Sequence, residues 1–85
     1  MIETAAILFK GKVYTLPRPA RHFDIIKHII KELDLHEFWG DERGFLDTHG
    51  RFLRRKPAAL HALRCNQVKS LDSLRNRELH SEDLW

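Results

Sequence analysis

Apolar residues are concentrated near the start of the chain in a pattern that predicts two short strands. In the stretch "TAAILFKGKVYTL" both faces of the first apolar run carry hydrophobic side chains, so this strand is expected either inside a sheet or covered by another subunit. Gly11 lies between Lys10 and Lys12 and can take the positive φ that a tight hairpin turn requires. The segment therefore predicts a β-hairpin.

The next apolar positions have helical spacing. At 100° per residue, one wide arc collects six apolar side chains, and polar residues lie opposite. These six are Phe23, Ile25, Ile26, Ile29, Ile30 and Leu33. Pro19 stands where a first helical turn tolerates a missing N–H. We predict an amphipathic helix that begins after Pro19, with His22 near the middle of its apolar arc.

The second half of the chain repeats the order of hairpin and helix. The stretch "GFLDTHGRFL" predicts a hairpin with Gly50 in its turn, and Pro57 is expected to open a second helix in "PAALHALRCNQV". Residues 34–44, "DLHEFWGDERG", lack a sustained period and indicate a loop or a short helical turn. The predicted order β-β-α-β-β-α indicates an α+β fold, in which a small antiparallel sheet of two hairpins carries two helices on one face.

A chain of 85 residues is expected to form a single domain, residues 1–85. Residues 69–85 read as a polar tail that ends in "SEDLW", and we predict that Leu84 and Trp85 dock on the sheet or on a neighbouring subunit. Domains of this size tend to be marginally stable alone. We therefore expect a homo-oligomer.

The net charge of +3 is small but unevenly distributed. Residues 10–31 and 43–69 are strongly basic, whereas residues 32–42 are acidic. Basic blocks suit an anionic partner, but the acidic block between them argues against a uniform basic stripe along DNA or RNA. Nucleic acid is therefore the third choice of partner, after an anionic small molecule and a protein.

No apolar run approaches the roughly 20 residues of a membrane span, and the N-terminus lacks the features of a secretion signal. The single cysteine, Cys65, excludes an intramolecular disulfide. We expect a cytoplasmic protein that does not contact a membrane.

The stretch "PRPARHFDIIKHIIK" is the first candidate anion site. The first N–H groups of a helix lack acceptors and carry the positive end of its dipole. Arg18 and Arg21 add guanidinium forks that suit phosphate oxygens, and His22 could donate from either ring nitrogen. The alternative is structural: Asp24 compensates the dipole, both arginines are solvated, and His22 belongs to the edge of the core. The residues alone favour this alternative.

A second basic cluster surrounds the start of the second helix. Arg51 and Arg55 would share one face of an extended strand, and Arg55 would supply a second contact to an anion. A solvated face explains both arginines as well. Phe38 or Trp39, in the acidic loop, could stack on a base.

Catalysis has little support in the sequence. Cys65 lies in a predicted helix and is more typical of a structural thiol than of a nucleophile. No two histidines are spaced as metal ligands on one helix, and no glycine-rich nucleotide loop is present. We therefore expect no enzyme, no metal and no cofactor.

Four stretches, in this order, resemble a pattern found in small proteins of bacteriophages and prophages. They are "GKVYTLPRPARHFDII", "RGFLDTHGRFLRRKPAA", "NQV" and "LHSEDLW". The shared features are an Arg-His pair before a helix, a Gly-Phe hairpin with Gly-x-Phe, and a closing Ser-Glu-Asp-Leu-aromatic. The matching positions are Arg21, His22, Gly44, Phe45, Gly50, Phe52, Arg55, Ala58, Gln67 and residues 81–85. The chain departs from the pattern at Arg43, where Gln is expected, at Arg54, Lys56 and Pro57, where a more acidic cap is expected, and at Asn66, where Gly is usual.

The resemblance implies a function in an infected bacterial host. Phage proteins of this size are often counter-defence factors, and the Thoeris anti-defence proteins are oligomeric sponges for nucleotide-derived immune signals. Polar residues at a helix start and in a tail would suit such a ligand, which favours a site at Arg21, His22 and Arg55. The leading hypothesis is a non-catalytic protein that binds a phosphate-bearing signal. The alternative is an anti-CRISPR-like inhibitor that binds a host defence protein. In that case either the acidic loop mimics the charge of nucleic acid, or a basic face of the chain docks on the host protein.

Overall fold

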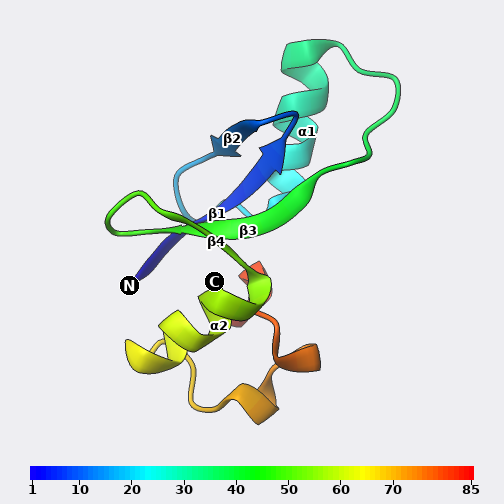
Figure 1. Cartoon of the computed structure of the whole chain (residues 1–85). Coiled ribbons are helices and arrows are strands. Elements are labelled where there is room, and N and C mark those ends of the chain that lie inside the picture. The colour runs from blue at the N-terminus through cyan, green and yellow to red at the C-terminus, as the bar shows by residue number, and fades with distance from the viewer.

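The computed structural model describes residues 1–85, and its elements follow the predicted order (Figure 1). The strands and helices are β1 (Ile2–Phe9), β2 (Lys12–Thr15), α1 (His22–Leu33), β3 (Glu42–Asp47), β4 (Phe52–Arg54) and α2 (Arg55–Arg64). Three single 3₁₀ turns follow α2, at Leu71–Ser73, Arg75–Arg77 and Ser81–Asp83. The predicted α+β fold is confirmed, because one antiparallel four-stranded sheet carries two helices.

The sheet has the order β2-β1-β3-β4, so β1 is an interior strand. This position explains why both faces of β1 are apolar, since Ala6 and Ile7 point to opposite faces and both are fully buried. Of the two explanations open to the sequence, the interior strand is therefore the observed one. Lys10 and Gly11 both have positive φ, at 51° and 77°, as a type I′ hairpin turn requires.

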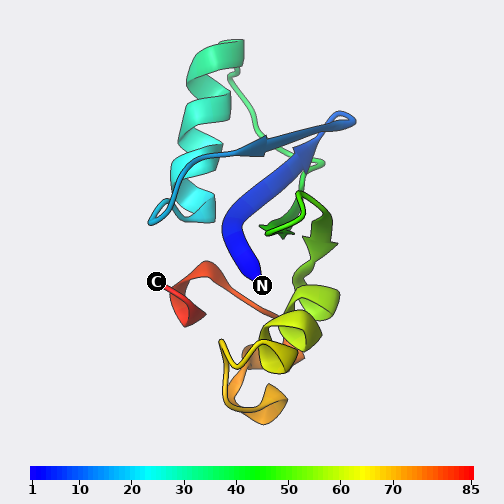
Figure 2. The same ribbon diagram turned by 90° about the vertical axis from the view of Figure 1, so that its left-hand side faces the viewer.

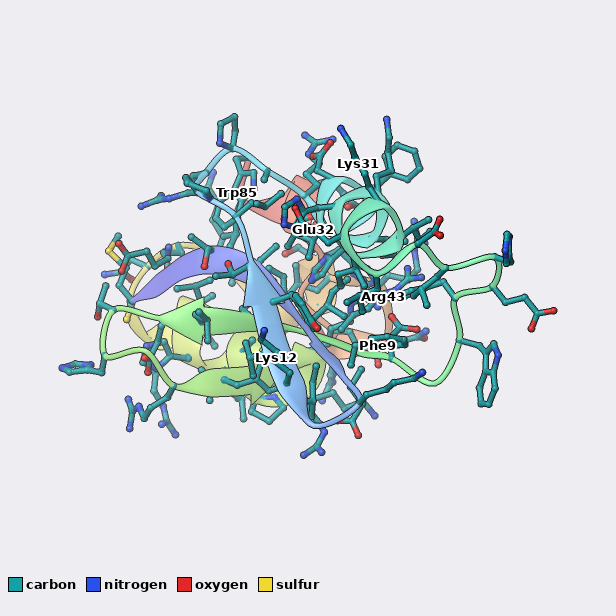
Figure 3. The ribbon with its side chains drawn as sticks, turned by 90° about the horizontal axis from the view of Figure 1, so that it is seen from above. Phe9, Lys12, Lys31, Glu32, Arg43 and Trp85 are labelled. Atoms are coloured by element: carbon teal, nitrogen blue, oxygen red, sulfur yellow. The ribbon has the colours of Figure 1, made fainter.

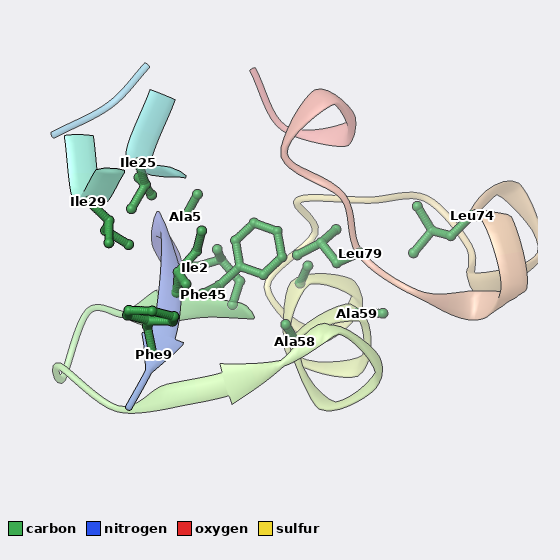
Figure 4. Packing of buried hydrophobic residues seen from close by; sticks show 12 residues of the cluster. Ile2, Ala5, Phe9, Ile25, Ile29, Phe45, Ala58, Ala59, Leu74 and Leu79 are labelled. Carbon is green, nitrogen blue, oxygen red and sulfur yellow. The ribbon is translucent and has the colours of Figure 1, made fainter. Parts of the chain in front are cut away.

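Phe45 of β3 lies in the middle of the hydrophobic core. Ile25 and Ile29 of α1 lie on one side of its ring, and Leu79 and Ala59 lie on the other (Figure 4). The small buried residues of α2 (Ala58, Ala59 and Ala62) let that helix pack closely against the same core. The core thus joins both helices to the sheet and to the tail.

Helix α2 begins two residues earlier than predicted. Pro57 is the third residue of the helix, where its missing N–H has no intrahelical acceptor to lose. Arg55 is consequently the first residue of α2 and does not lie on an extended strand. The predicted alternation that placed Arg51 and Arg55 on one strand face is wrong for this reason.

The tail runs back from α2 toward the start of α1 (Figure 2). Leu79 is fully buried, and its N–H donates to the main-chain oxygen of Arg55 at 3.1 Å. Trp85 Nε1 donates to the main-chain oxygen of Ala20 at 3.0 Å. The tail is therefore held at Leu79 against the start of α2 and at Trp85 against the segment that leads into α1, which brings tail side chains close to the first turn of α1.

Candidate anion-binding site

A basic cavity of about 500 Å³ lies where the starts of both helices, β3 and the tail meet. Its lining comes from Arg21, His22, Phe23, Arg43, Arg55, Arg75, His80, Ser81 and Glu82. We call it the arginine cavity, because four arginines face a single carboxylate there. Such a lining attracts an anion rather than a cation or an apolar molecule.

Arg43 reaches the arginine cavity because of the alternation of side chains along β3. It pairs with Ile7 across the sheet and lies two residues before Phe45, so both side chains are on the core face. Phe45 fills the core, whereas Arg43 (labelled in Figure 3) is near the start of the strand and lines the same cavity as His22 of α1. A charged residue in this position lies at the rim of the core.

Arg55 is held between α2 and the tail. Its Nε donates to the main-chain oxygen of Leu79 at 3.2 Å. Burial lowers the pKa of Arg55, and the neighbouring charge of Arg43 acts in the same direction. The guanidinium remains charged, and the nearby carboxylates of Glu78, Glu82 and Asp41 partly oppose this lowering of its pKa.

His22 is only 5% exposed, and its Nε2 lies 2.7 Å from the main-chain oxygen of Gly44. A carbonyl oxygen only accepts, so Nε2 carries the hydrogen. Burial, with the charges of Arg55 and Arg43, lowers the pKa of His22 to about 4, although the bond to Gly44 opposes the shift. The ring is therefore neutral near pH 7. The expectation that either nitrogen could donate is corrected: Nε2 donates within the protein, and Nδ1 can only accept.

Arg21 uses its guanidinium within the protein. Its Nε donates to the main-chain oxygen of Trp85 at 2.9 Å, and its Nη2 donates to the same oxygen. The Arg21 N–H donates to Asp24 Oδ2 at 2.8 Å, so a carboxylate of the protein already caps the first turn of α1. Arg21 contributes charge to the arginine cavity but has fewer free donors than the sequence indicated.

The other three predicted site residues lie outside the arginine cavity. Arg18 stacks on the ring of Trp85, with its Cζ 5.4 Å from the ring centroid. Arg51 forms an ion pair with Asp47 at 2.8 Å in the turn between β3 and β4. Trp39 is 74% exposed in the loop after α1. The structure thus brings together Arg21, His22 and Arg55, and it leaves Arg18, Arg51 and Trp39 apart from them.

Several lining residues were missed by the sequence reading. Arg43 could have been found from its position two residues before a core phenylalanine on the same strand face. Ser81 and Glu82 belong to the "SEDLW" motif, which the sequence marked without giving it a place in a site. His80 stands in the quoted stretch "LHSEDLW" but had no place in a site, and Arg75 carries no local signal; the folding back of the tail brings both to the cavity.

The whole chain, residues 1–85, matches the family model described as "Phage T4 y16D protein". The chain belongs to this family. The y16D-family chain is therefore a small phage protein, as its motifs had indicated. No curated protein and no solved structure matches it. None of its helices has the length and apolar character needed to cross a membrane.

A second hollow of about 500 Å³ adjoins the arginine cavity of the y16D-family chain and shares Arg43 and Arg55 with it. Here the charges are mixed. Arg54 Nε lies 2.5 Å from Glu42 Oε2, and Glu78 lines the same hollow. Two carboxylates, Glu42 and Glu78, face four basic residues in this hollow, whereas the arginine cavity has one carboxylate for four arginines and is the stronger anion site.

Cys65 has a histidine partner that the sequence reading overlooked. His61 lies one helical turn earlier, and its Nε2 is 3.9 Å from Cys65 Sγ. The same Nε2 lies 2.8 Å from the amino group of Met1. The distance to sulfur is long for a hydrogen bond, so this pair is a weak contact at the end of α2.

Proposed function

We propose that this y16D-family protein binds a phosphate-bearing small molecule in the arginine cavity without catalysing a reaction on it. The single observation that carries the proposal is the convergence of Arg21, Arg43, Arg55 and Arg75 on one cavity with Glu82 as the only acidic side chain. Guanidinium groups match the geometry of phosphate oxygens. A volume of about 500 Å³ lies within the usual range for small-molecule sites.

Because the family is a phage family, we infer that this binding takes place in the infected cell. A protein that sequesters a nucleotide-derived immune signal would blunt a bacterial defence by stoichiometric capture, with no catalytic group required. We therefore propose counter-defence as the biological function. A homo-oligomer in the host cytoplasm remains part of this proposal.

Isothermal calorimetry with a panel of nucleotides tests the proposed function. The panel holds adenosine monophosphate, ADP-ribose and cyclic dinucleotides, and the variant is Arg43→Ala combined with Arg75→Ala. Both side chains are exposed, so their removal should spare the fold. We expect at least one member to bind, with a loss of about tenfold or more in the double variant, because charge-assisted hydrogen bonds contribute about 1.5–3 kcal/mol each.

Arg77→Ala is the matched control, because Arg77 is exposed, lies outside the cavity and is two residues from Arg75. It should bind the ligand as the unaltered protein does. Absence of binding by every member of the panel would contradict the proposed function, and so would a double variant that binds normally.

One observation favours the second candidate, an inhibitor that binds a host defence protein. Trp39 is 74% exposed in the acidic loop, where its ring is available to a partner. Charge mimicry by this loop is weaker than the sequence indicated, because Asp41 pairs with Arg43 at 3.2 Å and Glu42 pairs with Arg54. Under this alternative, a host protein co-purifies with the chain at moderate salt and is lost with Trp39→Ala.

A further inference from the structure

The two most buried side chains of the arginine cavity each have a polar atom without a hydrogen-bond partner. His22 is 5% exposed and Ser81 is 3% exposed, and both line the cavity. His22 Nδ1 and Ser81 Oγ form no hydrogen bond within the protein. No fully buried side-chain nitrogen or oxygen lacks a partner, so both atoms keep some solvent-accessible surface, and both residues line the cavity. These two atoms are unsatisfied unless a guest or solvent reaches them.

The bond between His22 and Gly44 fixes what His22 can offer to a ligand. Because Nε2 carries the hydrogen, Nδ1 presents a lone pair and only accepts. Phosphate oxygens near neutral pH are also mainly acceptors, so a phosphate group alone gives Nδ1 no partner. A ligand that displaces solvent from Nδ1 therefore leaves this nitrogen unpaired unless it supplies a hydroxyl or an N–H group.

His80 makes a second acceptor in the same cavity. Its Nδ1 lies 3.1 Å from the main-chain oxygen of Glu78, and this carbonyl only accepts. Asp83 Oδ2 lies 3.7 Å from the same nitrogen, so Nδ1 carries a hydrogen, and in the tautomer with hydrogen on Nδ1 alone the Nε2 atom has a free lone pair. The arginine cavity thus combines donors on its arginines with acceptors on its two histidines, and Ser81 can act as either.

We propose that the ligand of the arginine cavity is a phosphate ester that also carries hydroxyl groups, such as a ribonucleotide or a sugar phosphate. Its phosphate lies among Arg43, Arg55 and Arg75, and a hydroxyl group donates to His22 Nδ1 with Ser81 Oγ as a further partner. This inference rests on the proposed function, since it requires that the arginine cavity binds phosphate. It adds the requirement that the ligand carries hydroxyl groups, which the positive charge of the cavity alone does not impose.

Calorimetry with a matched pair of nucleotides tests the requirement on the full chain. Adenosine monophosphate and 2′,3′-dideoxyadenosine monophosphate share the phosphate and the base and differ in the ribose hydroxyls. We expect the ribonucleotide to bind about fivefold to tenfold more tightly, as one or two neutral hydrogen bonds allow. Equal affinities for the two nucleotides would overturn the inference.

Two variants connect the difference in affinity to the named atoms. Ser81→Ala removes an oxygen that forms no hydrogen bond within the protein, so the fold should be retained. His22→Gln offers an amide N–H to Gly44 but places no acceptor at the position of Nδ1. Each variant should reduce the ratio of the two affinities, and a ratio unchanged in both would overturn the inference. If His22→Gln does not fold, Ser81→Ala decides.

Arg43→Ala separates this inference from the proposed function. It should weaken both nucleotides by a similar factor and leave their ratio unchanged. If both nucleotides bind with equal affinity and Arg43→Ala weakens both, only the hydroxyl requirement is contradicted. No binding of either nucleotide, of ADP-ribose or of the cyclic dinucleotides would contradict the proposed function and this inference together.

Discussion

His22 Nε2 donates to the main-chain oxygen of Gly44 across 2.7 Å, which joins the first residue of α1 to the middle of β3. The imidazole also packs edge-on against Phe45, with ring centroids 5.0 Å apart and an interplanar angle of 81°. One side chain thus ties the start of a helix to the sheet and to the central ring of the core. Because Nε2 is used in this bond, His22 can offer a ligand in the arginine cavity only the acceptor Nδ1.

The first prediction concerns stability in mild acid. Folding lowers the pKa of His22 from 6.5 to about 4, so the unfolded chain binds this proton more readily than the folded chain does. The stability that depends on neutral His22 is complete above pH 6.5 and decreases as the pH falls toward 4, by about 3 kcal/mol. Urea unfolding at a series of pH values measures this loss.

His22→Gln is the control for this prediction, because it cannot titrate. Its stability should vary less over the same pH interval. Asp47 does not interfere, since hydrogen bonds from the Arg51 N–H and side chain hold the pKa of its carboxylate at about 2, below the interval. An equal pH dependence in His22→Gln and the unaltered protein would contradict the assignment to His22.

The second prediction concerns Gly44. A Cβ atom at this position would lie 2.3 Å from the main-chain oxygen of Leu53 and 2.7 Å from Phe52 Cζ. The Leu53 oxygen belongs to the neighbouring strand and cannot move without disturbing the pairing of β3 with β4. Gly44→Ala should therefore lower the free energy of unfolding by about 3 kcal/mol in urea titration.

Gly40 provides a matched comparison in the loop after α1. A Cβ there meets no atom within 4 Å, but the residue has a φ of 78°. Gly40→Ala should cost about 1 kcal/mol through the backbone alone. If the two variants are equally stable, the steric explanation for Gly44 is wrong.

Much of this fold could be predicted from the sequence because its signals are local. The helical arc of isoleucines and the Lys10-Gly11 turn each depend on neighbouring residues, and both elements are present. The start of α2 could not be fixed, since Pro57 fits the first and the third position of a helix equally well. This difference between the predicted and the observed start of α2 matters, because it moves Arg55 from a strand face to the first turn of the helix.

Only part of the candidate site could be predicted from the sequence, because only some of its residues are neighbours along the chain. Arg21 and His22 are adjacent at a helix start, so their proximity needed no knowledge of the fold. Arg43 and Arg75 reach the same cavity only through the position of β3 and the return of the tail. In sequence, Arg18 and Arg51 are as suitable as Arg21 for binding an anion, but in the fold Arg18 stacks on Trp85 and Arg51 pairs with Asp47.

The third prediction concerns the end of the tail. Removal of Leu84 and Trp85 deletes the oxygen that holds the Arg21 guanidinium, the Trp85 bond to Ala20 and the ring beneath Arg18. We expect the free energy of unfolding to decrease by about 2 kcal/mol. Trp39→Ala removes an exposed tryptophan instead and should have little effect. Light scattering of the shortened chain tests whether the tail also contacts another subunit; unchanged stability and mass together would contradict docking of the tail.

The fourth prediction concerns Gln67, which pairs with the main chain of β1 as a neighbouring strand would. Its Oε1 accepts from the Ile2 N–H at 2.7 Å, and its Nε2 donates to the Ile2 oxygen at 3.0 Å. Gln67→Leu should lower the free energy of unfolding by about 2–3 kcal/mol, because both main-chain groups lose a partner. Gln67→Glu keeps only the acceptor and should cost less. Equal losses in the two variants, measured by urea unfolding, would contradict this account.

The gathering of arginines around one cavity has a cost for the empty protein. Burial lowers the pKa of the Arg55 guanidinium, the like charge of Arg43 acts in the same direction, and Glu82 is the sole acidic residue of the lining. Like charges that lie close together lower the stability of the unliganded protein. Residues that lower stability in this way are usually ones that serve function. Neutral replacements at Arg43 or Arg75 should therefore raise the melting temperature of the unliganded chain, so that the forms least able to capture an anion are also the most heat-resistant.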